Sequence, residues 1–122
     1  MVDNSYFFDS YAIIELIEGN PAYLRYMQSR MATTTLNLIE VHYHLLKKFG
    51  DKFAEAFFVS LLHATVDYVP VIPKANVMRY SMRRRDVSTP DCVGYLVAQS
   101  AGMKFLTGDK EFENMPNVEF VK

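Results

Sequence analysis

The chain has 122 residues, of which 50% are hydrophobic and 22% are charged, and its 13 Lys and Arg against 14 Asp and Glu give a net charge of −1. The length fits a single domain over residues 1–122, and the hydrophobic content excludes an intrinsically disordered chain. The charge balance argues against a broadly basic nucleic-acid binder, and the single cysteine, Cys92, excludes an intrachain disulfide and a zinc site made of several cysteines.

Targeting signals are not evident in the sequence. The first residues include Asp3 and Asp9 and lack the basic region of a signal peptide. The longest uncharged stretches, 56–66 and 92–103, are shorter than the roughly 20 residues that a membrane-spanning helix needs. We therefore expect a cytoplasmic protein with no membrane segment.

The N-terminal quarter predicts one strand and two helices. Residues 6–8 form a short apolar run that is typical of a buried strand. Ser10 is expected to cap a helix that ends near Gly19. Pro21 is suited to the first turn of a helix and predicts a second short helix over 22–28.

The middle of the chain predicts a second strand and two longer helices. Residues 31–34 are β-prone, and Thr35 is expected to cap a helix that runs to Phe49. Gly50 follows as a C-terminal glycine. A further helix is predicted over 52–64, and its aromatic and leucine side chains are expected in the core or at a dimer contact.

The following segment predicts an edge strand and a helix. Residues 67–72 have the composition of a strand, and Pro70 would place that strand at the edge of the sheet. A helix is expected to begin at Pro73 and to run to about Arg84.

The C-terminal part has the clearest helix start. Thr89 as N-cap, followed by Pro90 and Asp91, predicts a helix that extends to Ala101. The remaining expected elements are a strand, one helical turn and a final strand, at 103–107, 111–115 and 118–121. Strands that alternate with helices predict an α/β fold with a parallel sheet covered on both faces.

Four acidic residues lie where such a sheet would bring them together. Asp9 and Asp109 directly follow predicted strands, at the edge where open α/β sheets bind ligands. Asp91 lies in the first turn of a helix, and Glu40 lies early in the helix after the second strand. Carboxylate oxygens favour Mg²⁺ or Mn²⁺, so their convergence would make a divalent-cation site. The alternative is that each residue is only a turn or helix-cap residue.

Four motifs resemble those of PIN domains, the nuclease fold of VapC-type toxins. They occur in the family's order, at 6–10 (YFFDS), 35–40 (TLNLIE), 88–91 (STPD) and 105–112 (FLTGDKEF). The resemblance covers essentially the whole chain, and its last motif is the most specific. It implies a three-layer α/β/α sandwich with a central parallel sheet, and metal-dependent endoribonuclease activity.

The resemblance also implies roles for individual residues. The positions that match the family's acidic quartet are Asp9, Glu40, Asp91 and Asp109, and the supporting hydroxyl positions are Ser10 and Thr107. The three aspartates would hold Mg²⁺ or Mn²⁺, which activates a water and stabilises charge on the phosphate. Glu40 would hold a second ion or orient the water, and one-metal and two-metal versions both stay open.

Two tyrosines depart from the family pattern. Tyr11 stands where the family often has Ser or Asn, and Tyr95 stands where it prefers a small residue. Tyr95 is expected to narrow the cleft or to place a phenol near the RNA. Tyr95 therefore bears on substrate range more than on the metal site.

Two other groups of side chains allow more than one interpretation. Glu40 and His44 are four residues apart on one helix and could together bind a metal ion, with His42 nearby. No third nitrogen ligand is evident, which favours the alternative that the histidines are exposed or at the edge of the core. The stretch 74–86 has five basic residues and one acidic residue. Its arginines could bind RNA phosphates or form a solvated helix end; they are Arg79, Arg83, Arg84 and Arg85.

The leading hypothesis is an endoribonuclease that acts as the toxin of a toxin–antitoxin pair. It implies an RNA substrate, an antitoxin partner and a homodimer. One alternative is a housekeeping RNA-processing nuclease of the same fold, and another is a catalytically silent PIN domain that binds RNA or protein. The full acidic quartet argues against the silent domain, since a binding module has no use for four carboxylates that repel one another.

Overall fold

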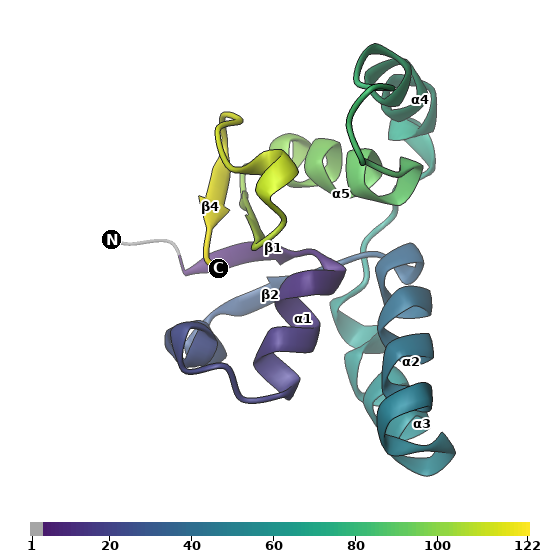
Figure 1. Cartoon of the computed structure of the whole chain (residues 1–122), viewed down its shortest axis with the longest axis vertical. Helices are drawn as coiled ribbons and strands as arrows, with labels where there is room; N and C mark the ends of the chain where they lie inside the picture. The colour runs from purple at the N-terminus through teal and green to yellow at the C-terminus, as the bar shows by residue number, and fades with distance from the viewer. Residues whose placement is uncertain (1–3) are drawn as a thin grey trace.

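The computed structural model describes residues 4–122, and its centre is a parallel sheet with helices on both faces (Figure 1). The strands are β1 (Ser5–Phe8), β2 (Arg30–Ala32), β3 (Lys104–Thr107) and β4 (Val118–Phe120). The α-helices are α1 (Ser10–Ile17), α2 (Thr35–Phe49), α3 (Asp51–Leu61), α4 (Ile72–Ser81) and α5 (Thr89–Ser100). Short 3₁₀ helices are η1 (Pro21–Gln28), η2 (Leu62–Ala64), η3 (Val69–Val71) and η4 (Lys110–Phe112). The three-layer α/β/α arrangement confirms the predicted fold class.

The order of the strands determines where a site can form. The sheet runs β2-β1-β3-β4, and every neighbouring pair is parallel. The chain leaves β1 toward β2 on one side and later returns to β3 on the other side, so the strand order reverses between β1 and β3. Ligands of open α/β sheets bind at such a switch point, beyond the carboxyl ends of the strands. The ends of β1 and β3 are therefore the place to look for a site.

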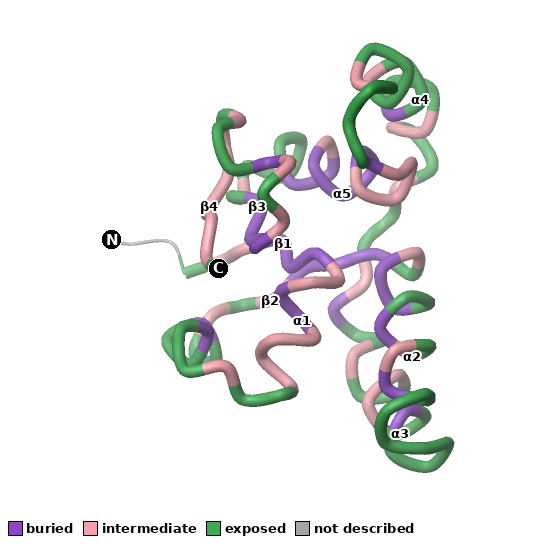
Figure 2. The backbone as a smooth tube through the Cα atoms, viewed as in Figure 1, coloured by how far each residue is buried: buried purple, intermediate pink, exposed green. Residues whose placement is uncertain are grey.

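Alternate residues of β1 face two separate hydrophobic cores. Phe7 packs with Phe105 and Val93 on the face covered by α5, whereas Phe8 packs with Leu106 and Leu38 on the face covered by α1 and α2. Figure 2 shows buried backbone along β1, β3 and α5 and on α1, while the outer turns of α3 and α4 are exposed. Because both cores include side chains of β1 and β3, these two strands hold the layers together and fix the position of their carboxyl ends.

Three helices begin one residue earlier than predicted. The capping side chains are Asp9, Thr34 and Ser88 rather than Ser10, Thr35 and Thr89. Each capping oxygen accepts a hydrogen bond from the backbone N–H three residues further on, which satisfies one of the free donors of the first turn. The helix predicted over 52–64 begins at Asp51 and ends at Leu61, and Gly50 precedes it without a side-chain hydrogen bond.

The predicted edge strand over 67–72 is wrong. This segment forms the 3₁₀ turn η3 and then enters α4 at Ile72. Pro70 and Pro73 each occupy a first-turn position, where the fixed backbone angle of proline suits a helix and its missing N–H is not needed. The helix that follows ends at Ser81, so Arg83, Arg84 and Arg85 lie in the turn after α4 rather than on the helix.

Within residues 4–122, no helix is both long enough and apolar enough to cross a membrane.

Candidate active site at the strand ends

Asp9 is the most buried of the acidic residues that the sequence singled out. It directly follows β1, caps α1 through a 2.8 Å hydrogen bond from the Ala12 N–H to Oδ1, and accepts a hydrogen bond from the Thr107 hydroxyl on Oδ2. Its side chain is only 5% exposed. The pKa of Asp9 is raised to about 7, chiefly by burial and to a smaller extent by the charges of Asp91 and Asp109, while the hydrogen bonds from Thr107 and Ala12 offset only part of the increase.

Thr107 links the two strand ends. It is the last residue of β3, it is fully buried, and its hydroxyl oxygen accepts a 3.0 Å hydrogen bond from the Asp109 N–H while donating its proton to Asp9. Asp109 in turn caps η4 by accepting the Glu111 N–H on Oδ1 at 3.0 Å. One hydroxyl therefore sets the positions of Asp9 and of the turn that carries Asp109.

Asp91 faces the same region from the start of α5. It is the third residue of this helix and forms a capping box with Ser88: Asp91 Oδ2 accepts the Ser88 N–H at 2.8 Å, and Ser88 Oγ accepts the Asp91 N–H at 3.2 Å. Burial raises the pKa of Asp91, and the charges of Glu40 and Asp109 contribute to the increase. These mutual effects mean that carboxylates from β1, β3, α2 and α5 share one electrostatic environment.

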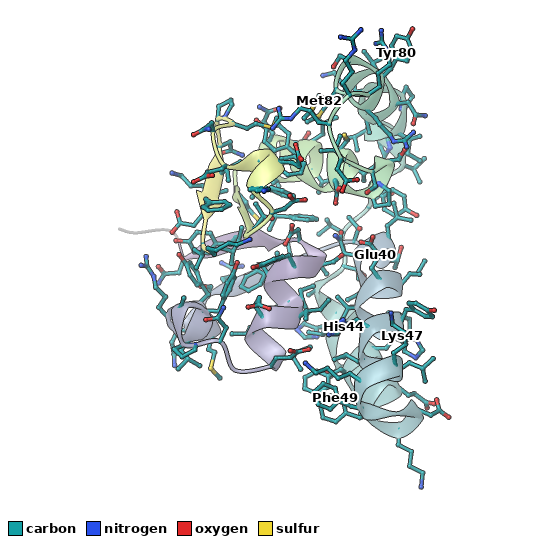
Figure 3. The ribbon with its side chains drawn as sticks, viewed as in Figure 1. Glu40, His44, Lys47, Phe49, Tyr80 and Met82 are labelled. Atoms are coloured by element: carbon teal, nitrogen blue, oxygen red, sulfur yellow. The ribbon has the colours of Figure 1, made fainter. Side chains whose placement is uncertain are left out.

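Glu40 is exposed on the first half of α2 and is held by Ser10. The Ser10 hydroxyl donates a 2.6 Å hydrogen bond to Glu40 Oε1 across the α1–α2 contact. In Figure 3, Glu40 lies near the end of α2 that is closest to the β-sheet, well separated from Tyr80 on α4. Ser10, expected as a supporting hydroxyl, thus contacts one member of the quartet, and Thr107 contacts another.

Asn37 is a residue of this network that the sequence analysis missed. It is buried, its Oδ1 accepts the Thr34 hydroxyl at 2.6 Å, and its Nδ2 donates to Ser10 Oγ at 3.1 Å. Ser10 has one proton, which it gives to Glu40, so the chain of donors runs in one direction from Thr34 to the carboxylate. The sequence did offer a signal for Asn37: it is a polar residue on the helix face that also carries the buried Leu38, Val41 and Leu45.

The donor set suits a hard divalent cation. All four acidic side chains provide oxygen ligands, and the buried charges of Asp9 and Asp91 are unfavourable without a compensating cation. In their present positions, however, no three His, Cys, Asp or Glu side chains within residues 4–122 form a ready metal-binding group. Mg²⁺ is commonly held by one or two carboxylates and several waters, so the residues fit such an ion without a complete protein cage.

The two unusual tyrosines have different environments. The expectation that Tyr95 narrows the cleft is wrong: Tyr95 is buried, donates a 2.6 Å hydrogen bond to the Pro116 carbonyl and stacks on Phe112. Its place on the core side of α5 explains this, since a large side chain there fills apolar space. Tyr11 does border the site. Its ring lies so close to Gly108, the residue before Asp109, that any side chain at this glycine would overlap it. Burial is the main cause of the raised pKa of Tyr11, and the charges of Asp9 and Asp109 also contribute.

The histidines contribute to packing rather than to the acidic region. His44 Nε2 lies 2.6 Å from Glu18 Oε2, and Lys48 Nζ lies 2.7 Å from Glu18 Oε1, which ties α2 to the end of α1. The His42 ring packs edge-on against Phe58. These contacts agree with the interpretation of both histidines as exposed or core-edge residues. Cys92 is also inert, because burial raises the pKa of its thiol to about 11.

The arginines lie in and after α4, beside the acidic region. Arg85 is bound to Glu111, with Nε 3.1 Å from Oε1, which joins this turn to the segment that follows Asp109. Arg83 donates a 2.9 Å hydrogen bond to the Tyr80 carbonyl. Arg79 and Arg84 are exposed. A surface hollow of about 360 Å³ is lined by three of these arginines. The arginines therefore form a basic rim, which the ion pair between Arg85 and Glu111 joins to the segment after Asp109.

Comparisons with known proteins support the same fold. The chain resembles a toxin–antitoxin complex from Klebsiella pneumoniae (TM-score 0.72, 18% identity, 93% of this chain and 95% of that chain). It also resembles VapC20 of Mycobacterium tuberculosis, described as a toxin that cleaves the sarcin–ricin loop (0.71, 17%, 93% and 98%), and a DNA-bound VapBC from Salmonella typhimurium (0.70, 20%, 96% and 96%). Among curated proteins, no sequence gives a significant match. The family model described as PIN domain matches residues 6–118, and the chain belongs to the PIN domain family.

Proposed function

We propose that residues 1–122 form a single PIN-like nuclease domain that hydrolyses RNA phosphodiester bonds with Mg²⁺ or Mn²⁺. The observation that carries this proposal is the set of acidic side chains at the switch point of the sheet, where Asp9 and Asp91 are held with raised pKa values by burial and by their acidic neighbours. Buried like charges destabilise a fold, so their presence together indicates a function that needs them.

The chain's own residues would divide the work as follows. Asp9, Asp91 and Asp109 are the proposed ligands of the cation, and Glu40 holds a second ion or orients the attacking water through the oxygen that Ser10 leaves free. When bound, a divalent cation makes water a better nucleophile and offsets the charge that builds up on the phosphate. Thr107 keeps Asp9 in place by donating its proton to Oδ2.

RNA would approach the acidic region across the basic rim. We propose that the rim arginines contact phosphates; they are Arg79, Arg83, Arg84 and Arg85. Their positive charge counters the repulsion between the carboxylates and an incoming phosphate. Arg85 reaches RNA only by loosening its ion pair with Glu111, so we expect it to contribute less than the other three.

The biological role that we propose is that of a cytoplasmic toxin with an antitoxin partner. The support is the fold shared with proteins described as toxin–antitoxin complexes and with a VapBC bound to DNA. A homodimer is part of the same proposal. A housekeeping nuclease of this fold is the alternative, and the two differ in one outcome: expression of a toxin arrests growth unless a partner from a neighbouring reading frame is produced with it.

The decisive experiment compares RNA cleavage by the wild type, Asp9→Asn and the control Asp51→Asn. Asp51 is an exposed residue in the first turn of α3, remote from the strand ends. The proposal is supported if cleavage requires Mg²⁺ or Mn²⁺ and is stopped by EDTA. It further requires that cleavage is lost in folded Asp9→Asn and retained in Asp51→Asn. Full cleavage by folded Asp9→Asn contradicts it, and no cleavage by the wild type favours a silent PIN domain.

A further inference from the structure

A hollow beside the acidic region has the properties of a binding site for a flat polar ligand. It lies between α4 and the turn after it, and its volume of about 360 Å³ falls within the roughly 300–1,000 Å³ of small-molecule sites. Its walls include an aromatic ring, a carboxamide and guanidinium groups, from Tyr80, Asn76, Arg79, Arg83 and Arg85. Three arginines against one acidic residue, Asp86, make the hollow basic.

Tyr80 presents a stacking surface on this hollow. Its side chain is 68% exposed at the last turn of α4, although tyrosine has a large apolar ring. The guanidinium of Arg83 lies 4.3 Å from the centre of the ring and is held there by its hydrogen bond to the Tyr80 carbonyl. An aromatic ring and a guanidinium plane are the two surfaces on which unpaired bases stack in RNA complexes. Both are preorganised here, since they already contact one another.

Hydrogen-bonding groups stand beside this surface. Asn76 lies one turn before Tyr80 on α4, and its carboxamide offers a donor and an acceptor, the combination that reads the edge of a base. Across the part of the chain that the structure describes, the Asn76 and Arg79 side chains form no hydrogen bond or ion pair. These groups are therefore free to bind a ligand without breaking an existing contact.

The hollow is connected to the acidic region but is distinct from it. Arg85 ties its rim to Glu111, two residues after Asp109, and the charge of Arg79 reaches Cys92, the neighbour of Asp91. In Figure 3 the labelled Tyr80 and Glu40 come from separate parts of the molecule. The hollow is not lined by any of the four carboxylates, so it would bind a part of the strand other than the phosphate that is cut.

We propose that this hollow binds an unpaired nucleobase of the RNA strand, stacked on Tyr80 and Arg83, so that the substrate is single-stranded on this side of the cleaved bond. The inference rests on the proposed RNA function and adds a base-binding subsite to it. It predicts that affinity depends on the presence of a base and not only on phosphate charge. Stacking of one base contributes about 1–3 kcal/mol, which is roughly a 5- to 150-fold effect on Kd.

The test measures the affinity of two fluorescent nine-nucleotide RNAs by anisotropy in Ca²⁺: oligouridylate and the same backbone without bases. The variants are Tyr80→Leu, Tyr80→Phe and the control Tyr43→Leu. Tyr43 is a matched residue because it is 60% exposed on α2 and also carries a cation over its ring, with Lys47 Nζ at 4.7 Å. Both positions are at the surface, and circular dichroism checks that each of the three variants is folded.

We expect Tyr80→Leu to weaken oligouridylate binding by about 5-fold or more and to leave the abasic RNA within about 2-fold of wild type. Tyr80→Phe should restore binding, and Tyr43→Leu should have no effect. Unchanged oligouridylate binding by Tyr80→Leu would overturn the inference. An equal loss of affinity for both RNAs would also overturn it and would indicate a surface that binds phosphate only. Wild-type protein that binds neither RNA would overturn it as well and would indicate a surface for a protein partner. Cleavage in Mg²⁺ is scored separately, so a protein that binds bases without cutting RNA refutes the proposed nuclease function and not this subsite.

Discussion

Replacement of Asp9 by asparagine should stabilise the metal-free protein at neutral pH, although it removes a hydrogen-bonded residue. The surroundings of Asp9, chiefly its burial, raise its pKa from 3.8 to about 7, a difference of about three. At 1.36 kcal/mol per unit, ionisation of Asp9 in the folded protein costs about 4 kcal/mol relative to the unfolded chain. Asparagine resembles the neutral acid, but its side-chain nitrogen cannot accept the hydrogen bond from the Thr107 hydroxyl. The loss of this hydrogen bond costs about 1 kcal/mol of stability. We therefore expect a net gain of about 2–3 kcal/mol above pH 7.

The pH dependence of this gain follows from the direction of the shift. Below about pH 4, Asp9 is protonated in the folded and unfolded states, so it costs no stability. Between about pH 4 and 7 the unfolded chain ionises while the folded protein keeps its proton, so the wild type loses stability as the pH rises. Above about pH 7 the loss is complete. The variant lacks this contribution, and its advantage over the wild type should grow across the same interval.

Urea unfolding in EDTA, followed by circular dichroism from pH 4 to 8, measures this difference directly. The difference in free energy of unfolding between Asp9→Asn and the wild type cancels the titration of groups that do not interact with Asp9. Asp51→Asn is the control, because this exposed residue should show no such trend. A difference that stays constant from pH 4 to 8, or that falls as the pH rises, would refute the argument that Asp9 is a strained, desolvated carboxyl.

Four further predictions test the site. Mn²⁺ affinity of the wild type, measured by calorimetry, should increase from pH 5 to about 7 and level off, since the cation competes with the proton of Asp9. Asp91→Asn should abolish RNA cleavage while the metal-free melting temperature stays the same or rises, and a clear drop would favour a purely structural role for this residue. Asn37→Asp should lower cleavage and Mn²⁺ affinity by about 10- to 100-fold. The new carboxylate would accept the hydroxyl hydrogen of Ser10, which now bonds to Glu40, in place of donating to Ser10. The exposed control Asn114→Asp should match the wild type. Replacing all three arginines at 83–85 with Gln should flatten the log–log salt dependence of RNA binding in Ca²⁺ by up to about 2, and identical slopes would show that they do not touch RNA.

The sequence predicted the layers and the strand ends well because these depend on patterns that tertiary contacts reinforce. Apolar runs such as 6–8 and 103–107 can be buried only as central strands here, and both strands form the core. Positions that depend on a choice between adjacent polar residues were less predictable. Ser88 and Thr89 are both good caps, and the structure uses the one whose oxygen reaches the Asp91 N–H.

Errors arose where local composition suited two structures. The apolar segment with Pro70 has strand-like composition, yet its prolines also favour a helix start, and packing of α4 against α5 decided the outcome. The side-chain direction of Tyr95 depends on the distant Pro116, so no local pattern could reveal it. Asn37 stood out locally as a polar residue on the buried face of α2, but its hydrogen bond to the distant Ser10 could not be read from the sequence. That the four acidic residues form the active site and hold a cation remains a prediction.

The contact between Asp9 and Thr107 joins residues that are 98 positions apart. The central pair of strands, β1 and β3, is equally non-local. During synthesis, an emerging chain therefore carries Asp9 without the strand that buries it until the segment between β1 and β3 has been made. Any nuclease activity would consequently begin only after residues 104–107 have been made, and prematurely terminated chains that lack these residues would have neither the central strand pair nor the hydroxyl that holds Asp9.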